Sequence, residues 1–270
     1  EIVTPDAHGD APIAAVAGGL HAIGLGAPMN AVSFQRILDG LAPPQVMVGH
    51  RVISAGDETA LLPPEAASMP SSLPERRRAS GAARLAARQL LGGLGHPSSA
   101  IPTGVDGAPQ WPEGIVGSLA HDDEVAVAAV GLTCDVSAIG IDVEPADPLP
   151  QEMLDLVVTA QERPHLRDDP MAARVLFAAK EAVYKAAYPR DRTFLEFHDI
   201  EVNLAVGKAE TKSGRVFTLR YCTAPRIVVL AFAFIVARNI PKWPRRDRTA
   251  GDSMESGAPA DPIPVGVAAD

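Results

Sequence analysis

The chain has 270 residues, 47% of them hydrophobic and 21% charged, and a formal net charge of −9. This length can bury one large core or two small ones, and the negative charge disfavours nonspecific binding of nucleic acid or of an anionic membrane. A phosphorylated small molecule, held in a local basic pocket, is compatible with such a chain.

The cysteines and histidines exclude two further kinds of site. Cys134 and Cys222 are the only cysteines and lie outside any Cys-x-x-Cys arrangement, so neither a disulfide framework nor a structural zinc site is indicated. No two of the seven histidines have the spacing of one helical face, which disfavours a zinc hydrolase. The sequence favours a hard cation held by carboxylates and a reducing cytoplasm as the location.

Both ends of the chain have little hydrophobic patterning. Residues 1–44 are rich in Ala, Gly and Pro and are predicted to be a loosely ordered extension, which lacks the basic start of a secretory signal. Residues 241–270 are predicted to be a disordered tail. The longest apolar run, 227–237, is about half of the ~20 residues that a membrane-spanning helix needs, so no membrane span is expected.

Residues 45–138 are predicted to form an N-terminal lobe. Apolar patterning over 45–55 and 124–132 is typical of strands. Between them, the Ala-, Arg- and Leu-rich segment 75–91 predicts a helix that is ended by two glycines.

Residues 139–240 are predicted to form a C-terminal lobe of similar outline. A strand over 138–144 is followed by a long helix over 170–187, stopped near Pro189, and by strands near 199–204, 216–222 and 227–236. The expected fold is α+β, with two similar lobes in a pseudo-twofold arrangement, each a small, mainly antiparallel sheet packed on a long helix. The active site is expected in the cleft between the lobes, and a monomer is expected because one chain supplies both.

Two carboxylates occur at alternate positions of the strand over 138–144. Asp142 and Glu144 should share one face of this strand, while Ile141 and Val143 face the core. A Mg²⁺ ion that also touches a substrate phosphate would satisfy both acids. The alternative is an exposed strand end with solvated acids before Pro145, and for this strand alone that alternative is favoured.

The long predicted helix carries charges opposite its core face. The core face is an apolar stripe at helical spacing, made of Ala172, Leu176, Ala179, Val183 and Ala186. Glu181 lies on the other side, and Lys185 follows four residues later, as in an ordinary helix pair worth ~0.2–0.5 kcal/mol. Together with Asp142 and Glu144, Glu181 could instead close around one Mg²⁺, while Lys180 and Lys185 face the phosphates.

Basic residues gather on the predicted helix of the N-terminal lobe. Arg77, Arg84 and Arg88 fall within one narrow stripe, and Arg76 and Arg78 flank the first turn. Guanidinium groups suit a terminal phosphate. A solvated basic face is an equally good interpretation of this helix alone.

A short segment before the strand at 124–132 offers donors to an anion. Gly117 permits close approach of the backbone, and Ser118 and His121 supply hydrogen-bond donors. The chain has no Gly-x-Ser-x-Gly motif, so a serine hydrolase is not expected.

Three segments form a distinctive set through their order and spacing. They are 108–121 (APQWPEGIVGSLAH), 140–145 (GIDVEP) and 177–185 (FAAKEAVYK). The set resembles the 4′-phosphopantetheinyl transferases, and the most similar branch is that of enterobactin synthetase component D. The basic segment 84–88 (RLAAR) also looks like the basic helix of that branch.

This resemblance implies a Mg²⁺-dependent transfer from coenzyme A. The implied metal ligands are Asp142, Glu144 and Glu181. The groups implied or offered for the phosphates of coenzyme A are Arg76, Arg77, Arg84, Ser118, His121, Lys180 and Lys185. A serine hydroxyl of an apo acyl or peptidyl carrier protein would attack the β-phosphate and release adenosine 3′,5′-bisphosphate. Glu181 or a metal-bound water would accept the serine proton, and Lys185 would protonate the departing phosphate. The favoured choice is Glu181 as base, with a weak or water-mediated contact to the metal.

Two other functions remain open at this point. The same carboxylates suit Mg²⁺-dependent hydrolysis of a phosphoester or diphosphate, and a non-catalytic module that only binds carrier proteins is the other alternative. Thr103 and Asp106 stand where relatives usually carry basic residues, which makes the module conceivable or implies a phosphate contact supplied elsewhere. Fatty-acid, siderophore and polyketide carriers all fit the sequence.

Overall fold

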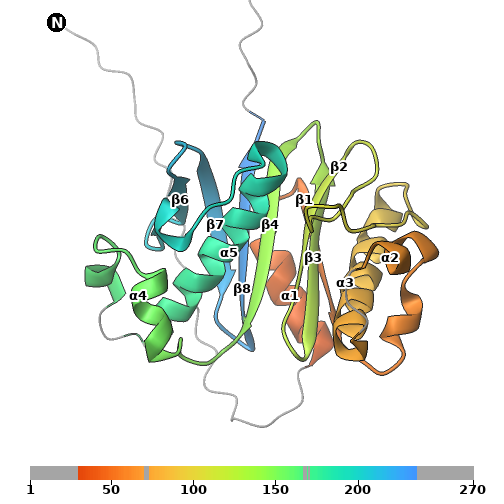
Figure 1. Ribbon diagram of the computed structural model, residues 1–270, viewed down its shortest axis with the longest axis horizontal. Coiled ribbons are helices and arrows are strands. Elements are labelled where there is room, and N and C mark those ends of the chain that lie inside the picture. Colours follow the sequence, from red (N-terminus) through yellow and green to blue (C-terminus); the bar gives the residue numbers. More distant parts are fainter. Residues whose placement is uncertain (1–29, 70–72, 167–168, 170, 236–270) are drawn as a thin grey trace, which may run out of the picture. The chain divides into compact units, whose positions relative to one another are not determined.

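The computed structural model describes residues 30–69, 73–166, 169 and 171–235 (Figure 1). The predictions for residues 1–29 and for the tail at 241–270 concern residues outside these ranges. Two antiparallel sheets, of three and five strands, form the framework, and each has a long helix on one face. This arrangement confirms the predicted α+β fold.

The three-stranded sheet has the order β1–β3–β2 and is antiparallel throughout. Its elements are β1 (Val46–Val52), η1 (Asp57–Ala60), α2 (Pro63–Ser68), α3 (Pro74–Gly93), β2 (Ile115–His121) and β3 (Val125–Leu132). Small residues bring α3 close to the sheet, because Ala82 of the helix and Ala126 of β3 share one buried cluster.

The five-stranded sheet has the order β4–β8–β7–β6–β5. Its strands are β4 (Val136–Pro145), β5 (Ile200–Asn203), β6 (Lys208–Thr211), β7 (Val216–Cys222) and β8 (Arg226–Phe234). The helices of this part are η2 (Gln151–Met153), α4 (Leu154–Val157), η3 (Arg163–Leu166), α5 (Ala172–Asp191) and η4 (Phe197–Asp199). The long helix α5 packs on β4 and β8 and buries the apolar stripe that its sequence predicted.

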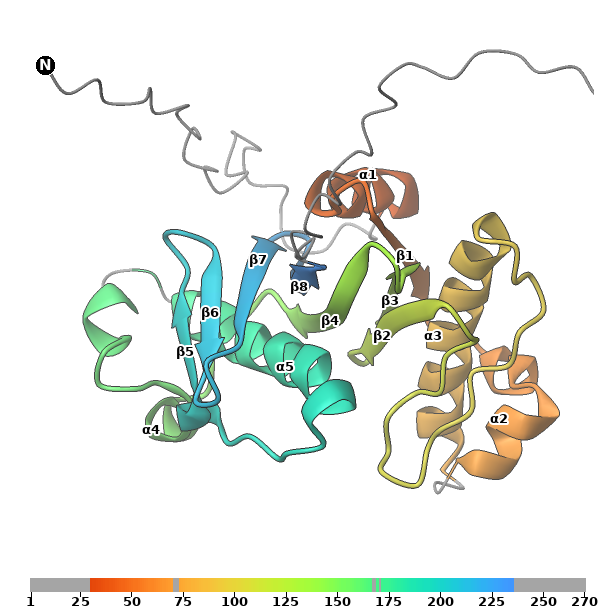
Figure 2. The same ribbon diagram turned by 90° about the horizontal axis from the view of Figure 1, so that it is seen from above.

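The two sheets meet at their edges and share one core. Strands β2 and β4, each the edge of its sheet, lie side by side (Figure 2). Ile141 and Val143 of β4 face this shared core together with Val127 of β3, as the alternation along β4 predicted. The opposite face of β4, which carries the acids, is left to α5.

A helix at the N-terminal side, α1 (Ala31–Leu41), corrects one prediction. Asn30 caps it by accepting from two backbone N–H groups of the first turn, and Phe34, Leu38 and Leu41 are buried in the shared core. The prediction of a loosely ordered extension is therefore wrong for residues 31–41. Three apolar residues at helical spacing, set in an Ala- and Gly-rich stretch, were too short a pattern to stand out.

Smaller differences concern strands and one helix end. The segment that was predicted to precede a strand is itself β2, and β6 was not predicted at all. Helix α5 continues past Pro189 to Asp191, and its C-cap residue Arg192 has a φ of 51°, in the left-handed region. Within the described ranges, no helix is both long and apolar enough to cross a bilayer.

Candidate active site

Six of the predicted site residues lie where β2, β4 and α5 adjoin (Figure 2). In chain order they are Ser118, His121, Asp142, Glu144, Glu181 and Lys185. The first two belong to one sheet and the other four to the second sheet and its helix. The junction of the two sheets is therefore where these side chains can act together.

A glycine in β4 determines how closely α5 approaches the strand. A Cβ atom added at Gly140 would lie 1.8 Å from the carbonyl oxygen of Ala182 and 2.7 Å from the backbone nitrogen of Ala186. Only glycine permits this contact. The turn of α5 that carries Glu181 and Lys185 therefore lies against the strand that carries the two acids.

Asp142 forms a buried ion pair with Lys185. The Nζ atom of Lys185 lies 2.5 Å from Oδ1 of Asp142, and the Asp142 side chain is only 7% exposed. The other carboxylate oxygen, Oδ2, is buried and has no hydrogen-bond partner. Burial raises the pKa of Asp142, against the opposing effect of Lys185. An oxygen in this position is poised to receive a cation.

Glu144 lies one pleat further along the same face. Its Oε2 atom accepts a hydrogen bond of 2.8 Å from Arg174 on α5. Burial raises the pKa of Glu144 to about 7, and the neighbouring charge of Asp142 acts in the same direction. Two carboxylates that disfavour each other's ionisation would gain from a shared divalent cation.

Glu181 is the third predicted ligand, and charges of the site act on its pKa. Burial raises the pKa of Glu181, Lys185 lowers it and Asp142 raises it. In the part of the chain that the structure describes, however, no three His, Cys, Asp or Glu side chains are grouped closely enough to hold a metal ion. The donor set and the unpartnered oxygen of Asp142 fit Mg²⁺ at Asp142 and Glu144, and the role of Glu181 as a third ligand stays a prediction.

A basic cavity lies on the three-stranded sheet beside these acids. Its volume is about 430 Å³, and its lining includes Arg76, Arg84, Thr103 and His121. A second cavity, of about 290 Å³, is called here the α5 cavity. Its polar lining includes Ser118, Glu181 and Lys185.

The basic cavity and the α5 cavity adjoin each other. Both are lined by Gly107, Pro109 and Leu119. Together they form one groove with cations at one end and a Glu–Lys pair at the other. Such a groove suits an extended ligand that carries several phosphates.

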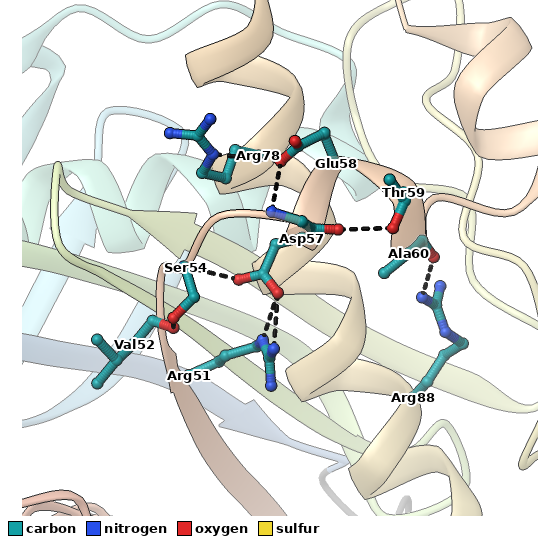
Figure 3. A network of polar contacts seen from close by, with 10 residues as sticks. Arg51, Val52, Ser54, Asp57, Glu58, Thr59, Ala60, Arg78 and Arg88 are labelled. Atoms are coloured by element: carbon teal, nitrogen blue, oxygen red, sulfur yellow. Dashed lines mark hydrogen bonds and ion pairs between the residues drawn. The ribbon is translucent and has the colours of Figure 1, made fainter.

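Two arginines of α3, Arg88 of the basic stripe and Arg78 beside it, have structural partners (Figure 3). Arg78 pairs with Glu58 at 3.2 Å, and Arg88 donates to the Ala60 carbonyl at 2.6 Å and to Glu65 at 2.7 Å. These contacts fasten η1 and α2 to the long helix. These ion pairs give the two arginines a structural role that neither interpretation of the sequence, phosphate binding or a solvated basic face, had predicted.

Arg84 is a largely buried part of the lining of the basic cavity. It is 5% exposed and donates to the Ile101 carbonyl at 2.8 Å and to the Thr103 hydroxyl at 2.9 Å. None of the described carboxylates lies within ion-pair distance of it. Burial lowers its pKa from the ordinary value, yet a guanidinium stays charged in proteins. Arg76 is exposed at the rim of the same cavity, whereas Arg77 lines neither cavity.

His121 lines the basic cavity at the end of β2. Packing around its ring lowers its pKa, and a hydrogen bond with the backbone of Asp122 opposes this effect. The positive charge of Lys185 lowers the pKa further. These effects favour the neutral form of the His121 ring, and a bound phosphate would favour its charged form.

Lys180 corrects the prediction that both lysines face phosphates. Its side chain is fully buried and donates to Glu162 at 2.8 Å, to the Val157 carbonyl at 2.8 Å and to the Phe197 carbonyl at 3.0 Å. Three acceptors use all the protons of the ammonium group. Lys180 therefore points away from Lys185, into the core beneath α4 and η4.

Sequence reasoning missed two arginines near the site. Arg174 holds Glu144, and Arg226 forms ion pairs with Asp122 and Glu124 beside His121. Neither lies in a recognisable motif. For Arg174, the available signal was its position two helical turns before Glu181, on the same face of α5. For Arg226 there was no such signal.

Comparisons with known proteins follow the same two halves of the chain. The model of the 4′-phosphopantetheinyl transferase N-terminal domain matches residues 64–131, and that of the 4′-phosphopantetheinyl transferase superfamily matches residues 138–232. The first match contains α3 and the basic cavity, and the second contains the acids of β4 and α5.

Three relatives are similar over more than half of this chain. The 4′-phosphopantetheinyl transferase Svp of Streptomyces mobaraensis is 37% identical over 174 residues, which are 62% of this chain and 71% of the relative. Npt of Nocardia iowensis is 40% identical over 56% of this chain and 70% of its own length. PptT of Mycobacterium tuberculosis is 41% identical over 52% of this chain and 64% of its own length. Npt and PptT are also named 4′-phosphopantetheinyl transferases.

Proposed function

The chain belongs to the 4′-phosphopantetheinyl transferase superfamily, and on that basis we propose that it transfers 4′-phosphopantetheine from coenzyme A to a serine of an apo carrier protein. The reaction would depend on Mg²⁺ and release adenosine 3′,5′-bisphosphate. The observation that carries this proposal is the pair of adjoining cavities, one basic and one lined by Glu181 and Lys185.

The basic cavity would hold the nucleotide end of coenzyme A. Arg84 offers a guanidinium with no acidic partner among the described residues, and Arg76 and His121 line the same space. The diphosphate would then extend past Leu119 into the α5 cavity, toward Ser118 and Lys185. Opposite charges on ligand and wall support this direction of binding.

A third cavity continues beyond Glu181 and Tyr184, which line both it and the α5 cavity. It has a volume of about 470 Å³ and is largely apolar, with Leu156 and Phe194 exposed at its rim by 60% and 69%. The uncharged pantetheine arm suits this lining better than a phosphate would.

Asp142 and Glu144 would hold Mg²⁺, which supplies charge neutralisation on the diphosphate when bound. Glu181 is placed to accept the proton of the attacking serine hydroxyl, and its raised pKa makes it a stronger base. The serine oxygen forms a bond to the β-phosphorus, and the bond from that phosphorus to the bridging oxygen breaks. Lys185 would give a proton to the departing phosphate of adenosine 3′,5′-bisphosphate.

The test is the mass of the carrier. Incubation with Mg²⁺, coenzyme A and apo carriers of the fatty-acid, polyketide and peptide-synthetase types should add one phosphopantetheine to at least one of them. Chelation of Mg²⁺, or a carrier whose acceptor serine is Ala, should abolish the gain. Carrier-independent release of adenosine 3′,5′-bisphosphate would indicate a hydrolase instead, and carrier binding without any transfer would indicate a binding module.

A cytoplasmic monomer remains part of the proposal. Both sides of the groove come from one chain, so no second copy is needed to complete it. Light scattering of the purified chain would show one copy per particle if this is correct.

A further inference from the structure

Arg226 links the two halves of the site without lining the groove. It is the first residue of β8 and pairs with Pro145 of β4, next to the Ile227–Glu144 pair. Its side chain is 15% exposed and crosses to the β2–β3 turn of the other sheet. There its Nη1 atom lies 3.2 Å from Oδ2 of Asp122, and its Nη2 atom pairs with Glu124.

Asp122 organises the turn that follows His121. Its Oδ1 atom accepts from the backbone N–H groups of Glu124 at 2.8 Å and Val125 at 2.7 Å, and its own N–H donates to the Val125 carbonyl at 3.0 Å. Asp122 directly follows His121, the last residue of β2, so the position of this turn determines where the imidazole ring lies. The second carboxylate oxygen, Oδ2, is buried and makes no hydrogen bond, so the Arg226 ion pair is what holds it.

We propose that Arg226 is a positioning residue that acts through Asp122, holding His121 in register with the Asp142–Lys185 pair. The strand pair β4–β8 carries Asp142 and the arginine together, so that any movement of β4 is passed to the turn. His121 is close enough to Asp142 and Lys185 for their charges to act on each other. The inference rests on the proposed function, because it gives His121 a ligand to bind.

The two ion pairs of Arg226 differ in how much they stabilise the turn. The Glu124 side chain is 71% exposed, so water and salt screen this contact and it contributes little. The Asp122 side chain is only 6% exposed, and loss of its partner would leave a buried carboxylate without compensation. The turn would then rearrange to solvate Asp122, and the imidazole ring of the preceding residue, His121, would move with it.

The experiment compares Arg226→Gln with Arg226→Lys in steady-state transfer assays on the full chain. For Arg226→Gln, the KM for coenzyme A should rise about 10-fold, the size of one charge-assisted contact, while the KM for the carrier stays unchanged. Arg226→Lys keeps the charge and should recover part of the affinity. Arg215→Gln, which breaks an ion pair with Asp191 away from the groove, is the matched control and should leave both constants unchanged.

A double-mutant cycle with His121→Gln separates positioning from simple stabilisation. If Arg226 acts through His121, the double variant should bind coenzyme A no more weakly than His121→Gln alone. Multiplied losses, or an Arg226→Gln variant that lowers Tm but keeps the KM for coenzyme A, would overturn the inference. If Arg226→Gln does not fold, calorimetric binding of coenzyme A to Arg226→Lys and to its double with His121→Gln decides the question by the same criterion.

Failure of the underlying function would look different. In that case the wild-type chain itself would transfer nothing to any carrier. If the wild-type chain is active but the losses in coenzyme A affinity of the two single variants add in the double variant, only the proposed role of Arg226 is wrong.

Discussion

Two lysines of α5, five residues apart, form two buried ion pairs that differ in how completely they are satisfied. Lys180 has three acceptors, and its partner Glu162 also accepts from the backbone N–H groups of Thr159 and Val202. Lys185, in contrast, meets one oxygen of Asp142 and leaves the other without a partner. A complete network fixes the fold, whereas an incomplete one marks the place that a ligand completes.

The largest expected effect tests the complete pair. Lys180→Met should lower the free energy of unfolding by about 3–5 kcal/mol, because it leaves Glu162 buried without its cation. Urea denaturation followed by circular dichroism measures this loss. Lys208→Met, which removes an exposed lysine bonded only to Thr218, is the control. A Lys180→Met variant that stays stable but binds coenzyme A more weakly would show that Lys180 contacts the substrate. The two lysines would then not differ in role.

The incomplete pair should respond in the opposite way. Asp142→Asn should lower kcat/KM for transfer about 10²–10³-fold, the usual cost of one electrostatic contact at a reacting group. Its Tm should stay the same or rise, since a buried carboxylate with a raised pKa is removed. Asp39→Asn on α1 is the surface control. A large fall in Tm with unchanged kcat/KM would show that this pair, too, is structural.

The pH dependence of thermal stability tests Glu144 of the same site. Glu144→Gln is compared with wild type in metal-free protein, with a chelator present. The pKa of Glu144 is raised from 4.5 to about 7 in the folded chain, so its contribution to stability is present below pH 4.5 and lost as the pH rises through 7. Glutamine does not titrate. The Tm of Glu144→Gln relative to wild type should therefore rise by a few degrees between pH 5 and pH 8. A constant difference across this range contradicts the prediction.

The smallest effect concerns Arg174, which competes with a cation for Glu144. Arg174→Gln should strengthen Mg²⁺ binding about threefold, in line with the loss of one partly exposed ion pair. Calorimetric titration of Mg²⁺ in the presence of coenzyme A measures this change. Arg163→Gln, which breaks the exposed pair with Asp155, should have no effect. Weaker Mg²⁺ binding in Arg174→Gln would mean that the arginine orients Glu144 for the metal.

The sequence predicted the elements that carry strong periodicity or motifs. Alternation along β4 placed Ile141 in the core and Asp142 on the other face, and the apolar stripe of α5 identified its buried side. Both follow from local geometry, with periods of 2.0 and 3.6 residues. Helix α1 and the short strand β6 had too few patterned residues to be seen.

The ion-pair partners of charged residues could not be predicted from local sequence patterns. Lys180 and Lys185 both lie off the core stripe of α5, and only a contact with Glu162, from an unpatterned segment, separates their roles. Arg226 reaches Asp122 across the junction of two sheets, more than one hundred residues earlier in the chain. Such pairings depend on tertiary packing, which no window of sequence contains.

The contact between Gly140 and the backbone of α5 has a consequence for natural variation. Even a single methyl group there would lift the helix off its strand, and the proton acceptor and the proton donor would move away together. The arginine-lined pocket belongs to the other sheet and would stay intact. A homologous chain with any other residue at this position should therefore still capture a nucleotide while passing nothing on, so this one position offers a simple marker for inactive copies.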